Sequence, residues 1–302
     1  MFSFYGTLLV VLLVDFNIRV LFFVKINLLE VCMTKKLITI DLDGTTLNNE
    51  SKITPKTIEV FKKAQHAGHM ISIVTGRPYR ISKQYYQQLG LDTPIVNFNG
   101  ALCHMPHELE WSAQYHKTLH RDIALDMLSL KKHMEIDMIA AEVKDSVYAD
   151  QFYMPNKDFF PDGKKGTNTL TAKNLKDDPT SVCVFTKKEN QASITNELIT
   201  RYGDSIEIRT WGGDTPCLEI VSAGVQKALG VECIADAYGF KQQDIIAFGD
   251  EDNDYEMIQY AGHGVVMKNG IDALKSIAND ITQKTNNEDG LASYLENYLH
   301  LA

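Results

Sequence analysis

The stretch LITIDLDGTT, residues 37–46, decides how this chain folds. Its first four residues are apolar or β-branched, which is typical of a short strand buried in a sheet. Asp41, Asp43 and Gly44 follow directly, so the strand runs into two carboxylates and a turn. Because open α/β sheets bind their ligands beyond the carboxyl ends of the strands, we expect Asp41 and Asp43 to lie in a cleft. Two residues apart on an extended segment, their side chains should point the same way.

The segments after this stretch alternate between helix and strand patterns. The first helix is expected from Thr54, its N-cap, and Pro55 in its first turn, up to a stop at Gly68. Further strands are predicted at residues 70–75, 94–98, 244–248 and 264–267, and further helices at 78–89, 227–238, 253–260 and 290–300. Such alternation predicts βαβ units and a parallel sheet.

The segment of residues 103–215 has a different texture. It is richer in Lys, Asp, Thr and Asn, and its strand-like runs at 138–143, 146–148, 181–186 and 206–210 lack regular helices between them. We therefore expect a separate α+β domain with an antiparallel sheet. The predicted fold is α/β, a Rossmann-like parallel core of residues 33–102 and 216–302 with an inserted α+β cap domain of residues 103–215.

The composition excludes several classes of protein. The chain has 302 residues, 44% of them hydrophobic, and 39 acidic against 30 basic residues give a net charge of −9. Because phosphate backbones need a basic surface, we expect no nucleic-acid partner. Five scattered cysteines, without metal-ligand spacing, argue against a disulfide scaffold or a zinc module and fit a cytoplasmic location. The sequence does not indicate an oligomeric state.

Residues 1–32 form an apolar N-terminal extension. Its uncharged run of residues 1–14 is shorter than the ~20 residues of a membrane-spanning helix. No basic residue precedes that run, as one would in a signal peptide. We favour a true translation start at Met33 and expect no membrane partner. A membrane-associating segment and an extra packed element stay open as alternatives.

Three further motifs place polar groups at strand ends or helix starts. Thr75, Gly76 and Arg77 follow the second strand, and the glycine allows backbone N–H groups to approach an anion. Lys227 begins a helix, and the run FGDEDND, residues 248–254, joins a strand to a helix. Each motif alone has an ordinary structural explanation, such as an N-capping turn. Their common placement favours a shared site instead.

Together these motifs resemble the haloacid dehalogenase-like hydrolases, specifically their Cof-like subfamily of capped sugar-phosphate phosphatases. The resemblance covers residues 35–300, and it includes Asn99-Gly100-Ala101 after the third strand and the large insertion between Thr75 and Lys227. It implies a phosphatase that acts on small phosphorylated metabolites. Asp43 supports this, because an acid two residues after the nucleophile can protonate an alkoxide leaving group.

The resemblance also implies catalytic roles. Asp41 would attack phosphorus and form an aspartyl-phosphate. Asp43 would act as general acid and then as general base. Mg²⁺ would be bound by the Asp41 carboxylate, the Asp43 backbone carbonyl and Asp250, offsetting the charge of nucleophile and phosphate.

Further residues are expected to bind phosphate or substrate: Leu42 and Gly44 through backbone amides, and Thr75, Gly76, Lys227 and Asn253. Two more residues, Arg77 and Asp254, are expected to hold these groups in position rather than bind the substrate themselves. Asp254 would orient either Lys227 or a metal-bound water.

Two alternatives remain beside the phosphatase. A phosphomutase of the phosphomannomutase type uses the same four motifs, and a non-catalytic phospho-ligand sensor would retain binding without turnover. The sequence does not identify the phosphorylated substrate or the degree of promiscuity, because residues 103–215 contain no motif with a known mechanism.

Overall fold

The computed structural model describes residues 9–10, 24–25, 35–108, 110–152, 160–211 and 215–301. The chain forms two compact units, the first ending at Lys35 and the second beginning at Lys36. In the first unit, strands β1 (Leu9–Val10) and β2 (Val24–Lys25) pair antiparallel. The predictions for residues 1–32 and for a start at Met33 lie almost entirely outside the described residues. No described helix is long and apolar enough to cross a membrane.

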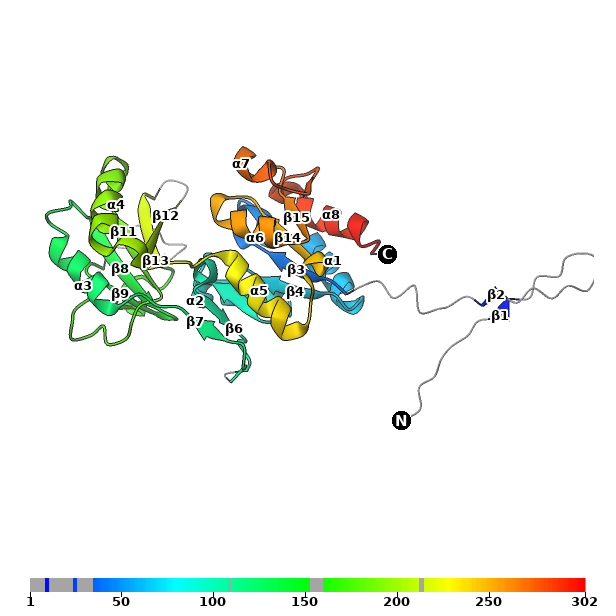
Figure 1. The fold of residues 1–302 in the computed structure, drawn as a ribbon, viewed down its shortest axis with the longest axis horizontal. Helices are drawn as coiled ribbons and strands as arrows, with labels where there is room; N and C mark the ends of the chain where they lie inside the picture. Colours follow the sequence, from blue (N-terminus) through cyan, green and yellow to red (C-terminus); the bar gives the residue numbers. More distant parts are fainter. Residues whose placement is uncertain are drawn as a thin grey trace, which may run out of the picture. The chain divides into compact units, whose positions relative to one another are not determined.

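A five-stranded, all-parallel sheet forms the core of the second unit (Figure 1). Its strands, in spatial order, are β16 (Asp280–Ile281), β15 (His263–Val266), β14 (Ile245–Gly249), β3 (Leu37–Ile40) and β4 (Met70–Ile73). The predicted parallel sheet is confirmed. β3 and β14 are neighbours, so the two segments that precede Asp41 and Asp250 end side by side.

Helices cover both faces of this sheet. Alternate residues of a strand point to opposite faces, so each face presents apolar side chains that a helix can bury. Ile38 and Ile40 pack in one apolar cluster with residues of α1 (Pro55–His66), α2 (Tyr79–Gln88) and α8 (Gly290–Tyr298). Leu37 packs in another with residues of α5 (Lys227–Tyr238), α6 (Tyr255–Tyr260) and α7 (Asp272–Lys275). The Thr54 side chain caps α1 by accepting a bond from the Thr57 N–H at 3.2 Å, as its sequence predicts.

The third predicted strand differs from expectation. β5 (Ile95–Asn97) pairs with the end of the parallel sheet through an isolated parallel bridge between Val96 and Val74, and is not one of its five strands. Its ladder is instead antiparallel, with β6 (Leu102–His104), which pairs with β7 (Tyr115–His116). The turn at Phe98–Gly100 folds the chain back on itself, so β5 gains a sequence-local partner.

A six-stranded sheet occupies most of the inserted segment. In spatial order its strands are β10 (Thr167–Thr169), β9 (Ser146–Ala149), β8 (Met138–Val143), β11 (Ser181–Phe185), β13 (Cys217–Ser222) and β12 (Ile206–Thr210). All neighbours pair antiparallel except β10 and β9. Through β13 this sheet continues to Ser222, past the expected end of the insertion at residue 215.

The expectation that no regular helices separate these strands is wrong. α3 (Arg121–Leu130) precedes β8, and α4 (Lys188–Tyr202) connects β11 to β12. α4 buries only Ile194 and Leu198, so its apolar stripe is too narrow to stand out in a polar sequence. Both helices pack on the sheet face formed by Ile139, Val182, Val184, Leu218 and Ile220.

Candidate active site

The predicted site residues of β3, β14 and α5 meet at the carboxyl edge of the parallel sheet. Asp41 follows β3, Asp250 follows β14, and Lys227 is the first residue of α5. The Asp41 N–H continues the ladder by donating to the Phe248 carbonyl at 3.1 Å. Asp41, Lys227 and Asp250 are all buried, which is costly for charged groups unless they are paired.

Lys227 pairs with two of the carboxylates. Its Nζ lies 2.7 Å from Asp41 Oδ1 and 2.6 Å from Asp254 Oδ1, and both the lysine and Asp254 are fully buried. Asp254 Oδ2 accepts from the Asp250 N–H at 2.9 Å and the Glu251 N–H at 3.2 Å. Of the two contacts expected for Asp254, the structure shows the one with Lys227. Asp254 is therefore fixed from both sides and holds the ammonium against Asp41.

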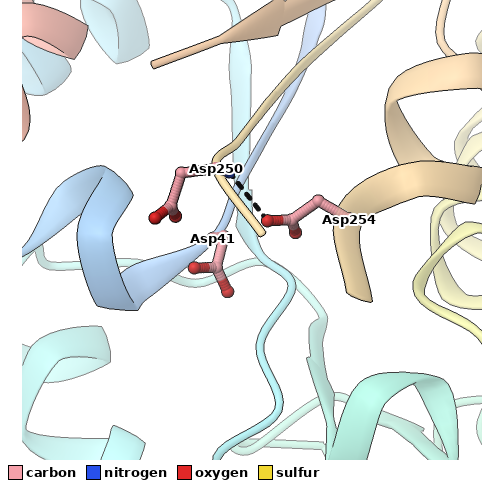
Figure 2. Close-up of side chains that lie close together, drawn as sticks. All are labelled: Asp41, Asp250 and Asp254. Carbon is pink, nitrogen blue, oxygen red and sulfur yellow. Dashed lines mark hydrogen bonds between the residues drawn. The ribbon is translucent and has the colours of Figure 1, made fainter. Parts of the chain in front are cut away.

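Asp250 completes a group of three carboxylates with Asp41 and Asp254 (Figure 2). One oxygen from each lies within 4.8 Å of the others, close enough to hold a metal ion together. Asp250 Oδ1 accepts from the Thr45 hydroxyl at 2.8 Å. At Gly44, where φ is +70°, an added Cβ would meet Asp250 Oδ2 at 2.0 Å, so only glycine lets this carboxylate approach the turn.

Burial and mutual repulsion raise the pKa values of two of these carboxyl groups. Burial raises the pKa of Asp250 to about 8, and the nearby Asp41 and Asp254 add to the rise. Burial also raises the pKa of Asp41 to about 7, although Lys227 opposes this. The pKa of Lys227 is raised above its ordinary value because Asp254 and Asp41 outweigh the effect of its burial. One lysine thus does not neutralise the three acids.

These observations fit a divalent cation. Lys227 donates to Oδ1 of Asp41 and to Oδ1 of Asp254. Within the described residues, Oδ2 of Asp41 and Oδ2 of Asp250 accept no hydrogen bond, so both are open to a cation. Oxygen donors of this type suit hard cations such as Mg²⁺. Asp41 and Asp250 are two of the three expected ligands. Asp43 was expected to contribute its backbone carbonyl.

The Asp43 side chain differs from the three carboxylates in its partner and in its exposure to solvent. It is 57% exposed and binds Arg77 through two parallel bonds, from Nε at 2.7 Å and from Nη2 at 2.5 Å. Asp41, two residues earlier, is buried. Arg77 therefore contacts a site residue, as expected of a supporting group.

The remaining predicted binding residues surround this centre. Thr75 is buried, and its hydroxyl accepts from the Arg77 N–H at 3.2 Å. Gly76 is crowded by Asn99, since an added Cβ would lie 2.9 Å from Asn99 Oδ1. Leu42 is fully buried, and its backbone begins the turn that contains Gly44.

Asn253 leads to two residues that the sequence analysis did not assign to the site. Its Nδ2 donates to Asn99 Oδ1 at 2.9 Å, and Asn99 Nδ2 donates to Glu219 Oε2 at 2.9 Å. Asn99, with φ at +54°, follows β5, and Glu219 lies in β13. The available signal was the glutamate itself, a charge inside the apolar run CLEIVS. Thr45 was also missed, although it lies inside the first motif.

Comparisons with known proteins agree with this geometry. Residues 38–295 match the haloacid dehalogenase-like hydrolase family. The 5-amino-6-(5-phospho-D-ribitylamino)uracil phosphatase YitU of Bacillus subtilis is 40% identical over 269 residues, covering 88% of this chain and 98% of the relative. The pyridoxal phosphate phosphatase YbhA of Escherichia coli is 28% identical, covering 89% and 100%.

Solved structures show the same fold. A crystal structure of a haloacid dehalogenase-like hydrolase from Bacteroides thetaiotaomicron superposes with a TM-score of 0.77 at 24% identity, covering 88% of this chain and all of that one. The family match spans most of the chain, and the YitU relative is aligned over nearly its whole length. This chain therefore belongs to the haloacid dehalogenase-like hydrolases, in their Cof-like subfamily, and is a phosphoric monoester hydrolase.

Proposed function

We propose that the protein is a Mg²⁺-dependent phosphatase that hydrolyses small phosphorylated metabolites, including sugar phosphates, through an aspartyl-phosphate. The observation that carries the proposal is the buried contact between Asp41 and Lys227 at the carboxyl edge of the sheet. An ammonium bound to one carboxylate oxygen orients the other and supplies positive charge where a phosphoryl group would develop negative charge. Mg²⁺, bound by Asp41 and Asp250, would supply further neutralising charge.

The two aspartates of the first motif divide the reaction between them. Asp41 forms an O–P bond as the bond to the leaving alcohol breaks, and Asp43 gives that alcohol its proton. Asp43 then takes a proton from a water molecule whose oxygen attacks phosphorus, which frees Asp41 and releases phosphate. The exposure of Asp43 suits this exchange of protons with leaving group and water, and Arg77 holds its carboxylate in place.

Lys227, Thr75 and Asn253 are the side chains proposed to bind the phosphoryl oxygens, with backbone amides of Leu42, Gly44 and Gly76. Asp254 positions Lys227. Charged donors in a buried site bind an anion more strongly than exposed ones, because water does not compete. The buried Lys227 provides such a charged donor beside the nucleophile, and the buried Thr75 hydroxyl provides a neutral one at the same edge of the sheet.

The six-stranded sheet with α3 and α4 is proposed to be a cap over the substrate, and the parallel domain the catalytic core. Contacts between them include Arg80 of α2 with Glu142 of β8, with Nη2 at 3.0 Å, and Asn99 with Glu219 of β13. Val221 of β13 also packs in one apolar cluster with Phe98 and Leu102. Relatives named as phosphatases of a ribitylaminouracil phosphate and of pyridoxal phosphate support a small phosphorylated substrate.

Replacing Asp41 by Asn tests the proposal. We expect Asp41→Asn to abolish Mg²⁺-dependent phosphate release from p-nitrophenyl phosphate, because an amide is a poor nucleophile. The matched control is Asp244→Asn, which removes a carboxylate just before β14 at its opposite end, where Asp244 pairs with Lys36 at 3.0 Å. Circular dichroism would confirm that both variants fold. Undiminished turnover by Asp41→Asn would refute the mechanism. Conversion of sugar 1-phosphates to 6-phosphates without phosphate release would instead show a phosphomutase.

A further inference from the structure

Buried polar atoms without partners cluster on one face of the six-stranded sheet. Within the described ranges, six buried side-chain polar atoms have no hydrogen-bond partner. Three of them are Glu142 Oε1, Ser181 Oγ and Glu219 Oε1. Such atoms are uncommon in folded proteins and costly, so each calls for an explanation. The three clustered here call for a common one.

The pairing register shows that the three residues share a face and lie on three adjacent strands. Ser181 of β11 pairs with Glu142 of β8, and Cys183 pairs with Glu219 of β13. Directly opposed residues point to the same face, as do residues two apart on a strand. Ser181 and Cys183 are two apart, so Glu142, Ser181 and Glu219 all point away from the face that α3 and α4 cover.

This face is turned toward the catalytic residues. Arg80 binds Glu142 Oε2, and Asn99 binds Glu219 Oε2, so each glutamate uses one oxygen to contact the parallel domain and leaves the other unpaired. Asn99 also accepts from Asn253, a proposed phosphate contact. Glu219 is thus two hydrogen bonds from Asn253, a proposed phosphate contact.

The chemistry of the cluster selects a ligand class. Two of the unpaired atoms are carboxyl oxygens, which only accept hydrogen bonds when the group is ionised, and the third is a hydroxyl. Both glutamates are nine-tenths or more buried. Burial raises the pKa of Glu219 to about 7, although Arg209, Trp211 and Asn99 oppose the shift. Burial raises the pKa of Glu142 to about 6, although Arg80 opposes it. Arg209 donates to the Val225 carbonyl, and Arg80 donates to Glu142 Oε2, which is not the unpaired oxygen of that residue.

We propose that Glu142, Ser181 and Glu219 form a specificity subsite that accepts hydrogen bonds from hydroxyl or amine groups on the non-phosphate part of the substrate. This rests on the proposed function and adds a substrate class to it. A second anionic group would face acceptor oxygens there, so the subsite disfavours bisphosphates. That argues against a phosphomutase, whose reaction passes through a bisphosphorylated sugar. Because all three residues are buried, entry of a ligand requires this face to separate from Arg80 and Asn99.

The test compares two esters of similar size, glucose 6-phosphate with many donors and cyclohexylmethyl phosphate with none. The measured quantity is the ratio of their kcat/KM values. In the unmodified protein we expect glucose 6-phosphate to be favoured at least about tenfold, since a site built for donors rejects an analogue that lacks them. Glucose 1,6-bisphosphate should be a poorer substrate than glucose 6-phosphate.

Two variants then test the named atoms. In Glu219→Gln the amide oxygen keeps the bond from Asn99, while the amide nitrogen replaces the unpaired acceptor with a donor. The ratio should fall about tenfold, and Ser181→Ala should lower it severalfold. Ser293→Ala is the matched control, because Ser293 Oγ in α8 is also buried without a partner among the described residues but lies outside the subsite. It should leave the ratio unchanged.

The outcomes separate this proposal from the proposed function. A ratio near one in the unmodified protein, or an equal ratio in all three variants, would overturn the subsite. Absence of hydrolysis of both esters would overturn the phosphatase proposal instead. In that case calorimetric titration of Asp41→Asn with the same two esters gives the ratio as dissociation constants, so the subsite is tested without turnover. Thermal melting of each variant would exclude misfolding as the cause.

Discussion

Removing the buried ammonium of Lys227 should destabilise the protein far more than removing an exposed one. Lys227→Met takes the partner from Asp41 Oδ1 and Asp254 Oδ1, both within 2.7 Å of Nζ, and leaves two buried carboxylates facing each other. Breaking a buried ion pair costs about 3–5 kcal/mol. Asp254 keeps its two backbone N–H donors, so most of this cost falls on Asp41.

The cost should depend on pH, with a sign that follows from linkage. Asp41 already has a raised pKa of about 7, and without Lys227 that pKa rises further. Above pH 7 the folded variant then holds a proton that the folded parent protein has lost, while the unfolded chains hold none at Asp41. The difference in stability therefore grows with pH, by about 1.4 kcal/mol per pH unit for one proton.

Urea unfolding followed by circular dichroism, in EDTA at pH 7.0 and 8.0, measures this difference. The matched control is Lys36→Met, since Lys36 also pairs with an aspartate, Asp244 at 3.0 Å, but is 22% exposed. A partly exposed pair contributes at most about 1 kcal/mol. If Lys227→Met cost no more than Lys36→Met, or if its cost shrank as pH rose, the reasoning about the buried charges would be wrong.

Two further predictions concern the turn after Asp41 and the metal. Gly44→Ala should lower kcat/KM about 100-fold, because its Cβ displaces Asp250, and misplacing a catalytic group by about 1 Å costs that much. Gly90→Ala has a similar φ of +61° but open space around it, so its kcat/KM should stay at the parent value. Mg²⁺ should raise the melting temperature more at pH 8 than at pH 6, because the raised pKa values of Asp41 and Asp250 mean that protons compete with the cation at the lower pH. Thermal melting with Mg²⁺ or EDTA measures this, and an equal or reversed shift, or a shift retained by Asp250→Asn, would contradict it.

Much of the parallel domain could be predicted because its signals are local. The apolar run before Asp41, the Thr54 cap and the glycine at residue 239, which ends α5 with φ at +73°, each act within a few residues. Predictions were wrong where the local signal is weak or where a later segment decides the pairing. α4 has only two buried apolar residues, and β5 takes its partner from the turn that follows it.

The site residues of the four motifs could be named from their order along the chain, but their contacts could not. That Asp43 binds Arg77 while Asp41 binds Lys227 depends on which side chain the turn at Gly44 buries. Glu142 and Glu219 carry little local signal, because a single charge in an apolar strand can also lie at an exposed edge. Pairing of β8, β11 and β13 is what brings them to one face.

The sequence by itself determined the strand-then-acid motif, the alternation that builds a parallel sheet, and the family to which the chain belongs, because these depend on residue type and spacing. Only the tertiary structure decided that Lys227 would neutralise Asp41 from 186 positions away, and that Asn99 would join Asn253 to Glu219. The physical reason is that charges are paired by the packing of distant segments. Burial then fixes how strongly each pair is held and which polar atoms are left for a ligand.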